Sequence, residues 1–561
     1  MPFNVSILTL SLTLALNSVA QTSTLPNGGE TGAGTHRLEA TRVDGGNFVR
    51  ASDGIQAATV LITGQHGLVI DGGKFSTARP QDYTRGIELA RGKSISLYNK
   101  EKPTQQTGQP GEVYKLYTPA EIKSIFASGD LSRIDKAFTS SDANGVLPEH
   151  LTEANALAAL QAANAIAAAR KQTAWKLSST QGNVEVNGGT FDFQSVNQNI
   201  IAANNGKLIW NGGRLTSSGG GGDTVLQGTT GIEVLAGSIK SSGTVAGNLT
   251  PIQYDDRHRL NRDRWTLGKY LAFFSNGNIN VGRRDQSSGP DIHLSDGMLM
   301  IGVVPAAQAT PGSPAPHHFN LYSGSVTLQG DYRSTLLLIQ RTFDVAALID
   351  GGTLNIVTND RLLRDRESPA MWNMKTVLKA GTINLTNGEV IGPDSAIHGG
   401  TLNMTGRSSF SSPMGSLTIS GGTINVGTHS FIGAIRGDSK TQSPYPTSQQ
   451  DLTISGATLK FKVAAPEQGR ELKVGTDIGG IYAGDNNPAK ASHPTLSIAS
   501  DTVIKLDTSA LTKGTYTAAN FASVDAGDGT LHIATPIPIG GATFSYSGTL
   551  DSHGALTIFV H

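Results

Sequence analysis

Two clusters of charged residues, in segments 255–265 and 360–372, contain side chains of the types that perform catalysis. Inverting hydrolysis of a glycosidic bond requires two carboxylates, with room for a water molecule between one of them and the sugar. Asp255-Asp256 is an acidic pair of this kind, but the chain lacks the Asn-Thr-Asp, Gly-His-Gly and Arg-x-Lys segments that polygalacturonase-like enzymes place on neighbouring coils. The sequence therefore favours a non-enzymatic protein, with a polysaccharide hydrolase or lyase as the alternative.

The same two clusters also contain residue types that are enriched at binding hot spots. Arg264 and Trp265 end the first cluster, and Arg366 and Trp372 lie in the second. Arg and Trp contribute strongly to protein interfaces when they are buried by a partner. We interpret the clusters either as two neighbouring loops that bind a partner through these four residues, or as solvated loops with internal salt bridges.

A third candidate binding element is the tripeptide Arg436-Gly437-Asp438, in a loop that runs from Gly427 to Gln450. An integrin-type receptor recognises such a tripeptide by pairing the Arg with a carboxylate and the Asp with a bound metal ion. In a chain with 68 Gly residues the tripeptide also arises by chance, so both interpretations stay open.

No cofactor or metal site is predicted. Residues 138–147 resemble the centre of an EF-hand calcium loop, with Gly145 at the position of its invariant glycine. That alignment places Ser140 at the first ligand position and Leu151 where a bidentate Glu is required. We expect a turn between helices at this position.

Composition excludes some classes of partner. The 561-residue chain has 44 Lys and Arg against 44 Asp and Glu, so its formal net charge is zero. Without a net field, attraction to nucleic acid or to an anionic membrane is not expected. The expected partners are a host receptor, an extracellular matrix component or a glycan, and self-association is a further interaction that the sequence allows.

The N-terminus and the absence of cysteine indicate export. Residues 1–20 contain no ionisable side chain, and the apolar run from Val5 to Leu16 ends in Ser18-Val19-Ala20, as in a secretory signal peptide. The alternative is a buried hydrophobic strand. Without cysteine, stability must come from burial and backbone pairing. We expect a secreted or cell-surface protein with no transmembrane segment in its mature chain.

One short pattern recurs along the chain: an apolar residue, any residue, a small pair ending in Gly, any residue and a second apolar residue. Gly189, Gly213 and Gly237 mark repeats 24 residues apart, and markers at 297, 324, 352, 381, 400 and 422 follow at 19 to 29 residues. Such a period is typical of one coil of a solenoid. The variable spacing favours β-coils, because their loops absorb insertions.

Each repeat reads as strand. In Thr423-Ile424-Asn425-Val426 the apolar side chains face one side and the polar side chains the other. A Gly pair supplies the positive φ that a corner between two short strands needs. An antiparallel sandwich or barrel is the alternative, but hairpins do not require similar residues at the same phase of every repeat. We predict an all-β, right-handed parallel β-helix, with Ile424 and Val426 inside and Thr423 and Asn425 outside.

Departures from the repeat divide the chain. We predict a signal peptide at 1–20, N-terminal β coils at 21–100, a helical insertion at 101–180, the β-helix at 181–500 and a C-terminal β cap at 501–561. The insertion is predicted from the Pro119-Ala120-Glu121 start signal and from the Ala-rich segment 153–170. The cap is predicted because the last open rung of a solenoid must be covered.

The Gly-Gly-Thr-apolar-Asn coils, the apolar N-terminus, the absence of cysteine and the cap resemble a bacterial autotransporter-type passenger of the pertactin-like class. This resemblance covers more than half of the chain and is at the level of the fold. It implies an adhesion or structural protein of the cell surface that acts through its loops. A polysaccharide-binding or polysaccharide-degrading β-helix of the pectin-lyase type and a self-assembling extracellular matrix protein are the alternatives.

Overall fold

The computed structural model describes residues 23–25, 35–50, 59–77, 98–105, 112–116, 118–130, 152–154, 156–157, 173–193, 198–218, 224–242, 270–295, 298–302, 318–330, 335–338, 346–358, 371–372, 375–412, 415–433, 451–484, 493–524, 529–534, 537–540 and 545–561. The chain divides into two compact units. The N-terminal unit comprises residues 1–230, 238–274 and 295–298, and the C-terminal unit comprises residues 231–237, 275–294 and 299–561. Each is described by itself.

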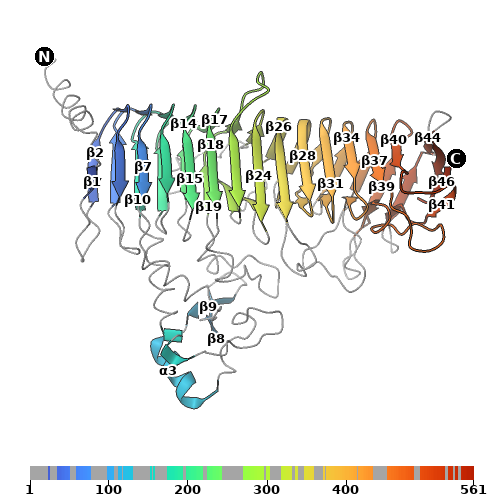
Figure 1. The fold of residues 1–561 in the computed structure, drawn as a ribbon, viewed down its shortest axis with the longest axis horizontal. Coiled ribbons are helices and arrows are strands. Elements are labelled where there is room, and N and C mark those ends of the chain that lie inside the picture. The colour runs from blue at the N-terminus through green and yellow to red at the C-terminus, as the bar shows by residue number, and fades with distance from the viewer. Residues whose placement is uncertain are drawn as a thin grey trace. The chain divides into compact units, whose positions relative to one another are not determined.

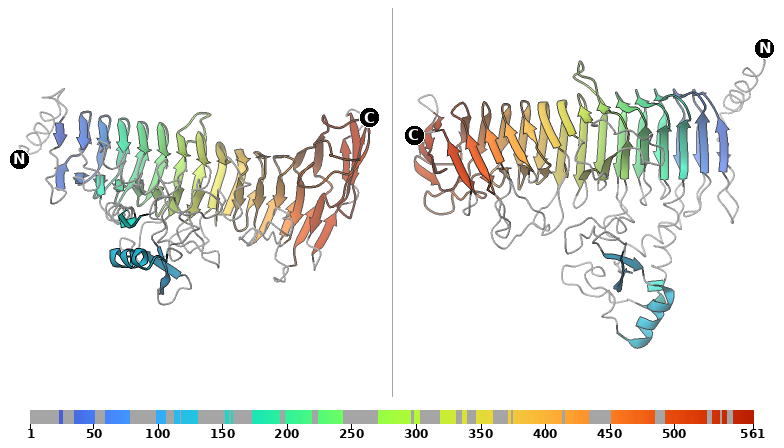
Figure 2. Two further views of the ribbon diagram at one scale, coloured as in Figure 1. Left: turned by 60° about the horizontal axis from the view of Figure 1, so that its bottom comes forward. Right: turned by 180° about the vertical axis from the view of Figure 1, so that it is seen from behind.

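Both units are parallel β-helices, as the sequence predicts. One coil of the N-terminal unit consists of β10 (Thr173–Ser179), β11 (Val184–Val186) and β12 (Thr190–Phe193). These strands pair in parallel with β13 (Gln198–Ala203), β14 (Lys207–Trp210) and β15 (Arg214–Ser218) of the next coil. Figures 1 and 2 show successive coils stacked side by side within each unit.

The N-terminal unit also contains strands that precede or follow this pair of coils. They are β1 (Ser23–Leu25), β2 (Thr35–Glu39), β3 (Arg42–Val43), β4 (Asn47–Arg50), β5 (Thr59–Gly64), β6 (Leu68–Ile70), β7 (Lys74–Thr77), β16 (Thr224–Gly228), β18 (Ser238–Ser242) and β19 (Tyr270–Phe274).

The C-terminal unit repeats the same coil. Its strands are β17 (Gly231–Val234), β20 (Ile279–Val281), β21 (Asp291–Ser295, whose last residue belongs to the other unit), β22 (Met298–Gly302, whose first residue does), β23 (His318–Leu321), β24 (Ser325–Gly330), β25 (Thr335–Leu338), β26 (Ala346–Thr358), β27 (Met371–Trp372), β28 (Lys375–Thr386), β29 (Glu389–Ile391), β30 (Ala396–Ile397), β31 (Thr401–Thr405), β32 (Ser409–Ser411), β33 (Ser416–Ile419), β34 (Thr423–Val426), β35 (Phe431–Gly433), β36 (Asp451–Ile454), β37 (Thr458–Lys462), β38 (Gly480–Ala483), β39 (Thr495–Ile498), β40 (Val503–Asp507), β41 (Gly514–Ala518), β42 (Ala522–Val524), β43 (Thr530–Ile533), β44 (Ile537–Gly540), β45 (Tyr546–Leu550) and β46 (Leu556–Val560).

The interior of the N-terminal unit is partly aromatic. Phe48, Phe75 and Phe191 occupy one register position in three successive coils. Their rings stack at centroid distances of 5.1 and 4.9 Å, and Trp175 meets Phe75 edge-on at 5.9 Å. Stacking like residues above like therefore fills the narrow core with large side chains and adds favourable ring contacts.

The interior of the C-terminal unit is mainly aliphatic. Ile424 and Val426 are 0% and 2% exposed, whereas Thr423 and Asn425 are half-buried on the outside. The predicted inside and outside assignments are therefore confirmed. Leu402 and Leu459 lie in register with Ile424 on the neighbouring coils and are also buried.

The Gly pairs form the corner between the second and third strands of a coil. Gly213 has φ of 87°, and a Cβ at Gly212 would lie 2.6 Å from the Asn187 carbonyl oxygen of the preceding coil. The positive φ of Gly213 favours glycine, and the nearby carbonyl oxygen leaves no room for a side chain at Gly212. The corner must therefore be tight, and its neighbours are held in a fixed register.

The insertion predicted at 101–180 contains strands as well as helix, and it ends before residue 173. Its described part contains a hairpin, β8 (Tyr98–Gln105) with β9 (Glu112–Leu116), which forms a sheet of its own. Helix α3 (Pro119–Ser128) follows, with a capping box between Thr118 and Glu121, and residues 153, 154, 156 and 157 are helical. Residues 173–179, placed in the insertion by the sequence, form the coil strand β10.

The C-terminal end of the chain is a β cap, but its start also differs from prediction. Parallel pairing continues past residue 501, because β40 pairs with β37 and β43 pairs with β39. The antiparallel part comprises β41, β46, β45 and β44, joined in that order. The predicted hairpin around residues 551–554 is present as the connection between β45 and β46.

Candidate functional site

A ladder of asparagine side chains lies on the outer face of the C-terminal unit. Asn355, Asn384, Asn403 and Asn425 occupy one register position on four successive coils. Each Nδ2 donates to the Oδ1 of the preceding Asn, at 2.8 Å for Asn384, 2.7 Å for Asn403 and 2.6 Å for Asn425. The Asn355 amide donates to Thr327 Oγ1 at 3.1 Å and ends the series. We call these five residues the amide ladder.

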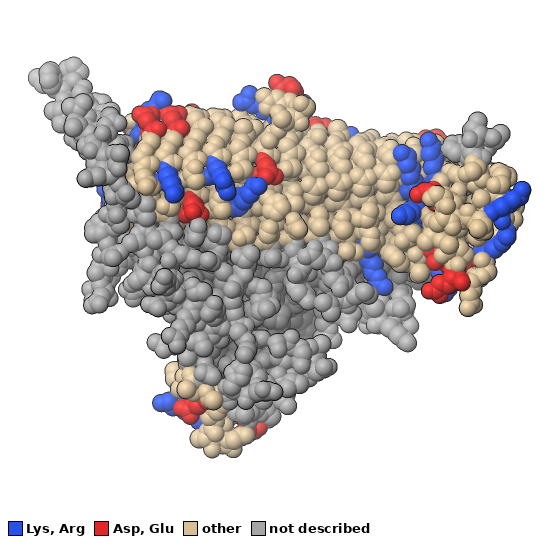
Figure 3. Space-filling view, in the orientation of Figure 1, with Lys and Arg blue, Asp and Glu red and all other residues tan. Residues whose placement is uncertain are grey.

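A row of hydroxyl side chains runs beside the amide ladder, two residues earlier on each strand. Thr353, Thr382, Thr401, Thr423 and Thr458 are in register and half-buried. Lys460 and Lys505 continue the ladder position beyond Asn425 and are exposed. Figure 3 shows that the surface over β31 and β34 is uncharged and that basic residues lie over β37 and β40. We call the amide ladder, the Thr row and the two lysines together the polar face.

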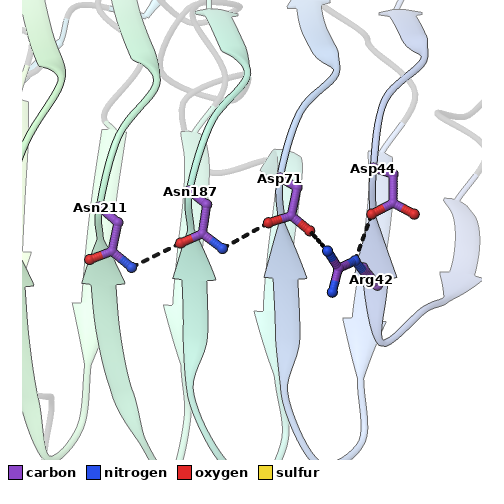
Figure 4. Close-up of polar contacts among 5 residues, drawn as sticks. All are labelled: Arg42, Asp44, Asp71, Asn187 and Asn211. Carbon is purple, nitrogen blue, oxygen red and sulfur yellow. Dashed lines mark hydrogen bonds and ion pairs between the residues drawn. The ribbon is translucent and has the colours of Figure 1, made fainter.

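A second ladder follows the corner of the N-terminal unit. Asn211 Nδ2 donates to Asn187 Oδ1, and Asn187 Nδ2 donates to Asp71 Oδ1, both at 2.8 Å. Arg42 then joins Asp71 to Asp44, through ion pairs of 2.6 Å each (Figure 4). Asp71 Oδ2 has no aligned hydrogen-bond donor, so its contact with Arg42 is ionic. We call this series the corner ladder.

The two carboxylates and the Arg of the corner ladder are of the types that polysaccharide lyases and hydrolases use. The hydrogen bond to Asp44 and the charges of Asp71 and Asp44 raise the pKa of Arg42 above its ordinary value. A guanidinium with a raised pKa stays protonated, so Arg42 is not suited to remove a proton from a sugar. The geometry instead fastens the corners of adjacent coils together.

An exposed loop interrupts one corner of the C-terminal unit. Residues 283–289 lie between β20 and β21 and are all exposed. Arg284 anchors the loop, because its Nη2 lies 3.2 Å from Asp350 Oδ2 and its guanidinium lies 4.7 Å from the centre of the Tyr322 ring. The Arg283 backbone N–H also donates to Ser323 Oγ at 3.0 Å. The loop thus protrudes from a fixed base.

The predicted binding residues lie in connections between strands, mostly outside the described residues. Arg264 and Trp265 fall between β18 and β19, and Arg366 falls between β26 and β27. Both connections join a third strand of a coil to a first strand, but they belong to different units. The backbone of Trp372 is described in β27, where it pairs with Leu337 and Ile391.

The Arg436-Gly437-Asp438 tripeptide falls in the connection from β35 to β36, at the opposite end of the first strand, and lies outside the described residues. The calcium-loop-like segment 138–147 lies outside them as well. Within the described residues no group of three or more His, Asp or Glu is placed to hold a metal ion.

The Thr-apolar-Asn repeat predicts rows of Thr and Asn on the outside of stacked coils, and the Thr row and the amide ladder confirm this. Sequence reasoning missed the corner ladder and the corner loop. The Asn repeat was visible as Thr-apolar-Asn, but its hydrogen bonds depend on the register of each coil. The loop had a visible signal in the sequence. In this coil the two corner glycines, Gly282 and Gly289, are separated by six residues instead of being adjacent. Ser325 N–H bonds to the Pro290 carbonyl, as Thr353 N–H bonds to the Gly324 carbonyl on the next coil. The predicted marker Gly297 lies outside the described residues and is not this corner.

Comparison with models of known protein families gives no match, and a search of curated protein sequences gives none. In the part of the chain that the structure describes, no helix has both the length and the apolar character needed to cross a bilayer.

Proposed function

We propose that this chain is a secreted or cell-surface adhesion and structural β-helix that attaches to an extended partner along its polar face. The observation that carries the proposal is the amide ladder, with hydrogen bonds of 2.6–3.1 Å over five successive coils. These bonds fix the Asn side chains before any partner arrives, so little side-chain entropy is lost on binding.

The repetition suits an extended partner. The four coils with β26, β28, β31 and β34 present the same pair of groups, a Thr hydroxyl and an Asn amide, about 4.8 Å from the pair on the next coil. An Asn amide has two donor hydrogens and two acceptor lone pairs, and the ladder uses one of each on Asn384 and Asn403. Many individually weak contacts along one partner molecule add to a strong attachment.

The surface loops provide a second element of the proposal. The loop at 283–289 has exposed polar side chains and a base fixed by Arg284, Tyr322 and Asp350. The connections that contain Arg264, Arg366 and Arg436 are proposed to contribute further contacts. Such loops would select the partner, because loops tolerate change more readily than the coils that carry them.

The test uses the purified full chain on an array of glycans and matrix proteins. Thr401→Val and Thr423→Val together remove two hydroxyls from the polar face and keep the side-chain shape. Thr418→Val and Thr453→Val are the matched control, because these two residues are also register neighbours but lie on β33 and β36. We expect weaker attachment for the first pair alone. Equal attachment by both variants would refute a role for the polar face.

The two alternatives give other results in the same preparation. A polysaccharide-degrading enzyme would release reducing ends or unsaturated sugars from the arrayed glycans. A self-assembling matrix protein would sediment as a polymer without any added partner. Either result, obtained together with no attachment by the native chain, would replace the adhesion proposal.

A further inference from the structure

The polar face has a distinct end. The outward residues of β24, β31 and β34, and those that follow the Gly corner in β26 and β28, are uncharged, whereas those of β37 and β40 include Lys460 and Lys505. The two lysines are register neighbours on adjacent coils. Both are exposed, and among the described residues neither forms an ion pair.

Among the described strands, no acidic residue lies in register with either of these lysines. Lys462 lies in register with Asp507, which provides it with an opposite charge. Lys460 instead has Asn425 on one side and Lys505 on the other. Like charges on adjacent strands repel each other, and this repulsion is relieved when an anionic group binds between them.

The ligand class follows from this distribution of groups. We propose that the polar face binds a linear acidic polysaccharide with carboxylates on only some of its sugars, whose hydroxyls pair with the Thr row and amide ladder and whose carboxylates pair with Lys460 and Lys505. This inference rests on the proposed adhesive function and names the ligand of the same surface. A carboxylate meeting an ammonium forms a charge-assisted hydrogen bond, which is stronger than a neutral one.

Two other polymers fit the surface less well. Nucleic acid carries a phosphate at every residue and is bound by cations along the whole contact, whereas the ladder from Thr327 to Asn425 has no cation. An extended peptide gains affinity by adding a strand to a free sheet edge. The polar face is the flat side of a sheet whose strands are paired on both sides, as β31 and β34 are.

The experiment compares partly methyl-esterified polygalacturonate, in which only some sugars carry a free carboxylate, with its fully methyl-esterified form, which has the same backbone without the charges. We expect the full chain to bind the acidic form at least tenfold more tightly at low salt, with a smaller ratio as salt rises. Lys460→Gln with Lys505→Gln should remove most of this preference, whereas Lys473→Gln with Lys513→Gln should weaken acidic binding less than about twofold. Lys473 and Lys513 are also exposed, and they lie outside the strands that form the polar face.

The outcomes separate the inference from the proposal on which it rests. Equal losses for the two lysine pairs, or equal affinity for the two polymers, would overturn the acidic polysaccharide as the ligand. If the chain attached to other arrayed partners through the Thr row but not to the partly methyl-esterified polygalacturonate, the adhesive function would stand and this inference would fail. No attachment to any partner would remove both.

Discussion

Asn403→Asp tests whether the amide ladder contributes to stability. Asn403 donates to Asn384 Oδ1 at 2.7 Å and accepts from Asn425 Nδ2 at 2.6 Å. The carboxylate keeps the second bond and loses the first, and it places an oxygen against the Asn384 oxygen. A lost hydrogen bond costs about 1 kcal/mol and an unsatisfied, half-buried acceptor about 1 more, while the charge-assisted bond from Asn425 returns up to ~1. We expect a net loss of about 1–2 kcal/mol at pH 7.

The loss should depend on pH in a defined direction. Only the protonated carboxyl can donate to Asn384 Oδ1, so its pKa in the folded state is raised. Stability from that bond is present in full below the unfolded-state pKa of about 3.9, and it is lost as pH rises through the folded-state pKa. The difference between variant and native chain should therefore shrink on going from pH 7 to about pH 4.

The assay is urea denaturation followed by circular dichroism, with hydrogen exchange of the peptides from β28 to β34 to localise the change. Asn425→Asp is the comparison, because it also loses its donor to Asn403 but lies in register beside Lys460. Its cost should be smaller, at about 0.5–1 kcal/mol, because the cation offsets part of the loss. A pH-independent loss, or a larger loss for Asn425→Asp, would refute the ladder geometry.

Three further predictions concern the core, the surface and the insertion. Ile424→Asp should destabilise the C-terminal unit by more than about 3 kcal/mol in urea, because it buries an unpaired carboxylate at a position with 0% exposure; a loss below that of Asn403→Asp would contradict the core assignment. The Ser509 hydroxyl and N–H lower the pKa of the exposed Asp507, so Asp507→Asn should cost less than about 0.5 kcal/mol at pH 7, and this cost should disappear as pH falls through the lowered pKa of the native carboxylate; an unchanged difference in acid urea melts would contradict this. Replacing residues 78–172 with five Gly/Ser residues should preserve the β-type circular dichroism, since connections 194–197 and 219–223 join the same strand positions; loss of that signal would show that the coils need the insertion.

The part of the fold that follows from local chemistry was predictable from the sequence. The alternation at Ile424 and Val426 identifies the interior because a strand has a period of two, and Gly212-Gly213 identifies a corner because only glycine fits. The first strand of each coil was not identified. Its residues, such as 173–179 in β10, follow no Gly pair and include the buried polar Ser178 and Ser179.

The corner ladder was not predictable because it depends on neighbours that are distant in the sequence. Asn187 accepts from Asn211, 24 residues later, but donates to Asp71, 116 residues earlier across the insertion. The register that brings these residues together is set by the coils on both sides, and no local pattern reports it. An isolated Asn before a Gly pair reads equally well as an ordinary turn residue.

Both ladders have a direction, and the charges at their ends match it. Every amide donates toward the preceding coil and accepts from the following one, so the N–H end of each ladder points toward the N-terminus. Aligned amide dipoles place partial positive charge at that end and partial negative charge at the other, as in a helix. The corner ladder ends at its N–H side on the carboxylate of Asp71, which Arg42 neutralises.

The amide ladder is followed at its carbonyl side by Lys460, which occupies the next register position after Asn425. A cation is favoured there for the same reason that Lys and Arg are favoured at a helix C-terminus. The ladder therefore helps to hold a positive charge beside Lys505, where the two ammonium groups repel each other. An anionic group bound at this end would then be attracted by both lysines, and hydroxyls bound further along would meet only neutral amides and Thr side chains.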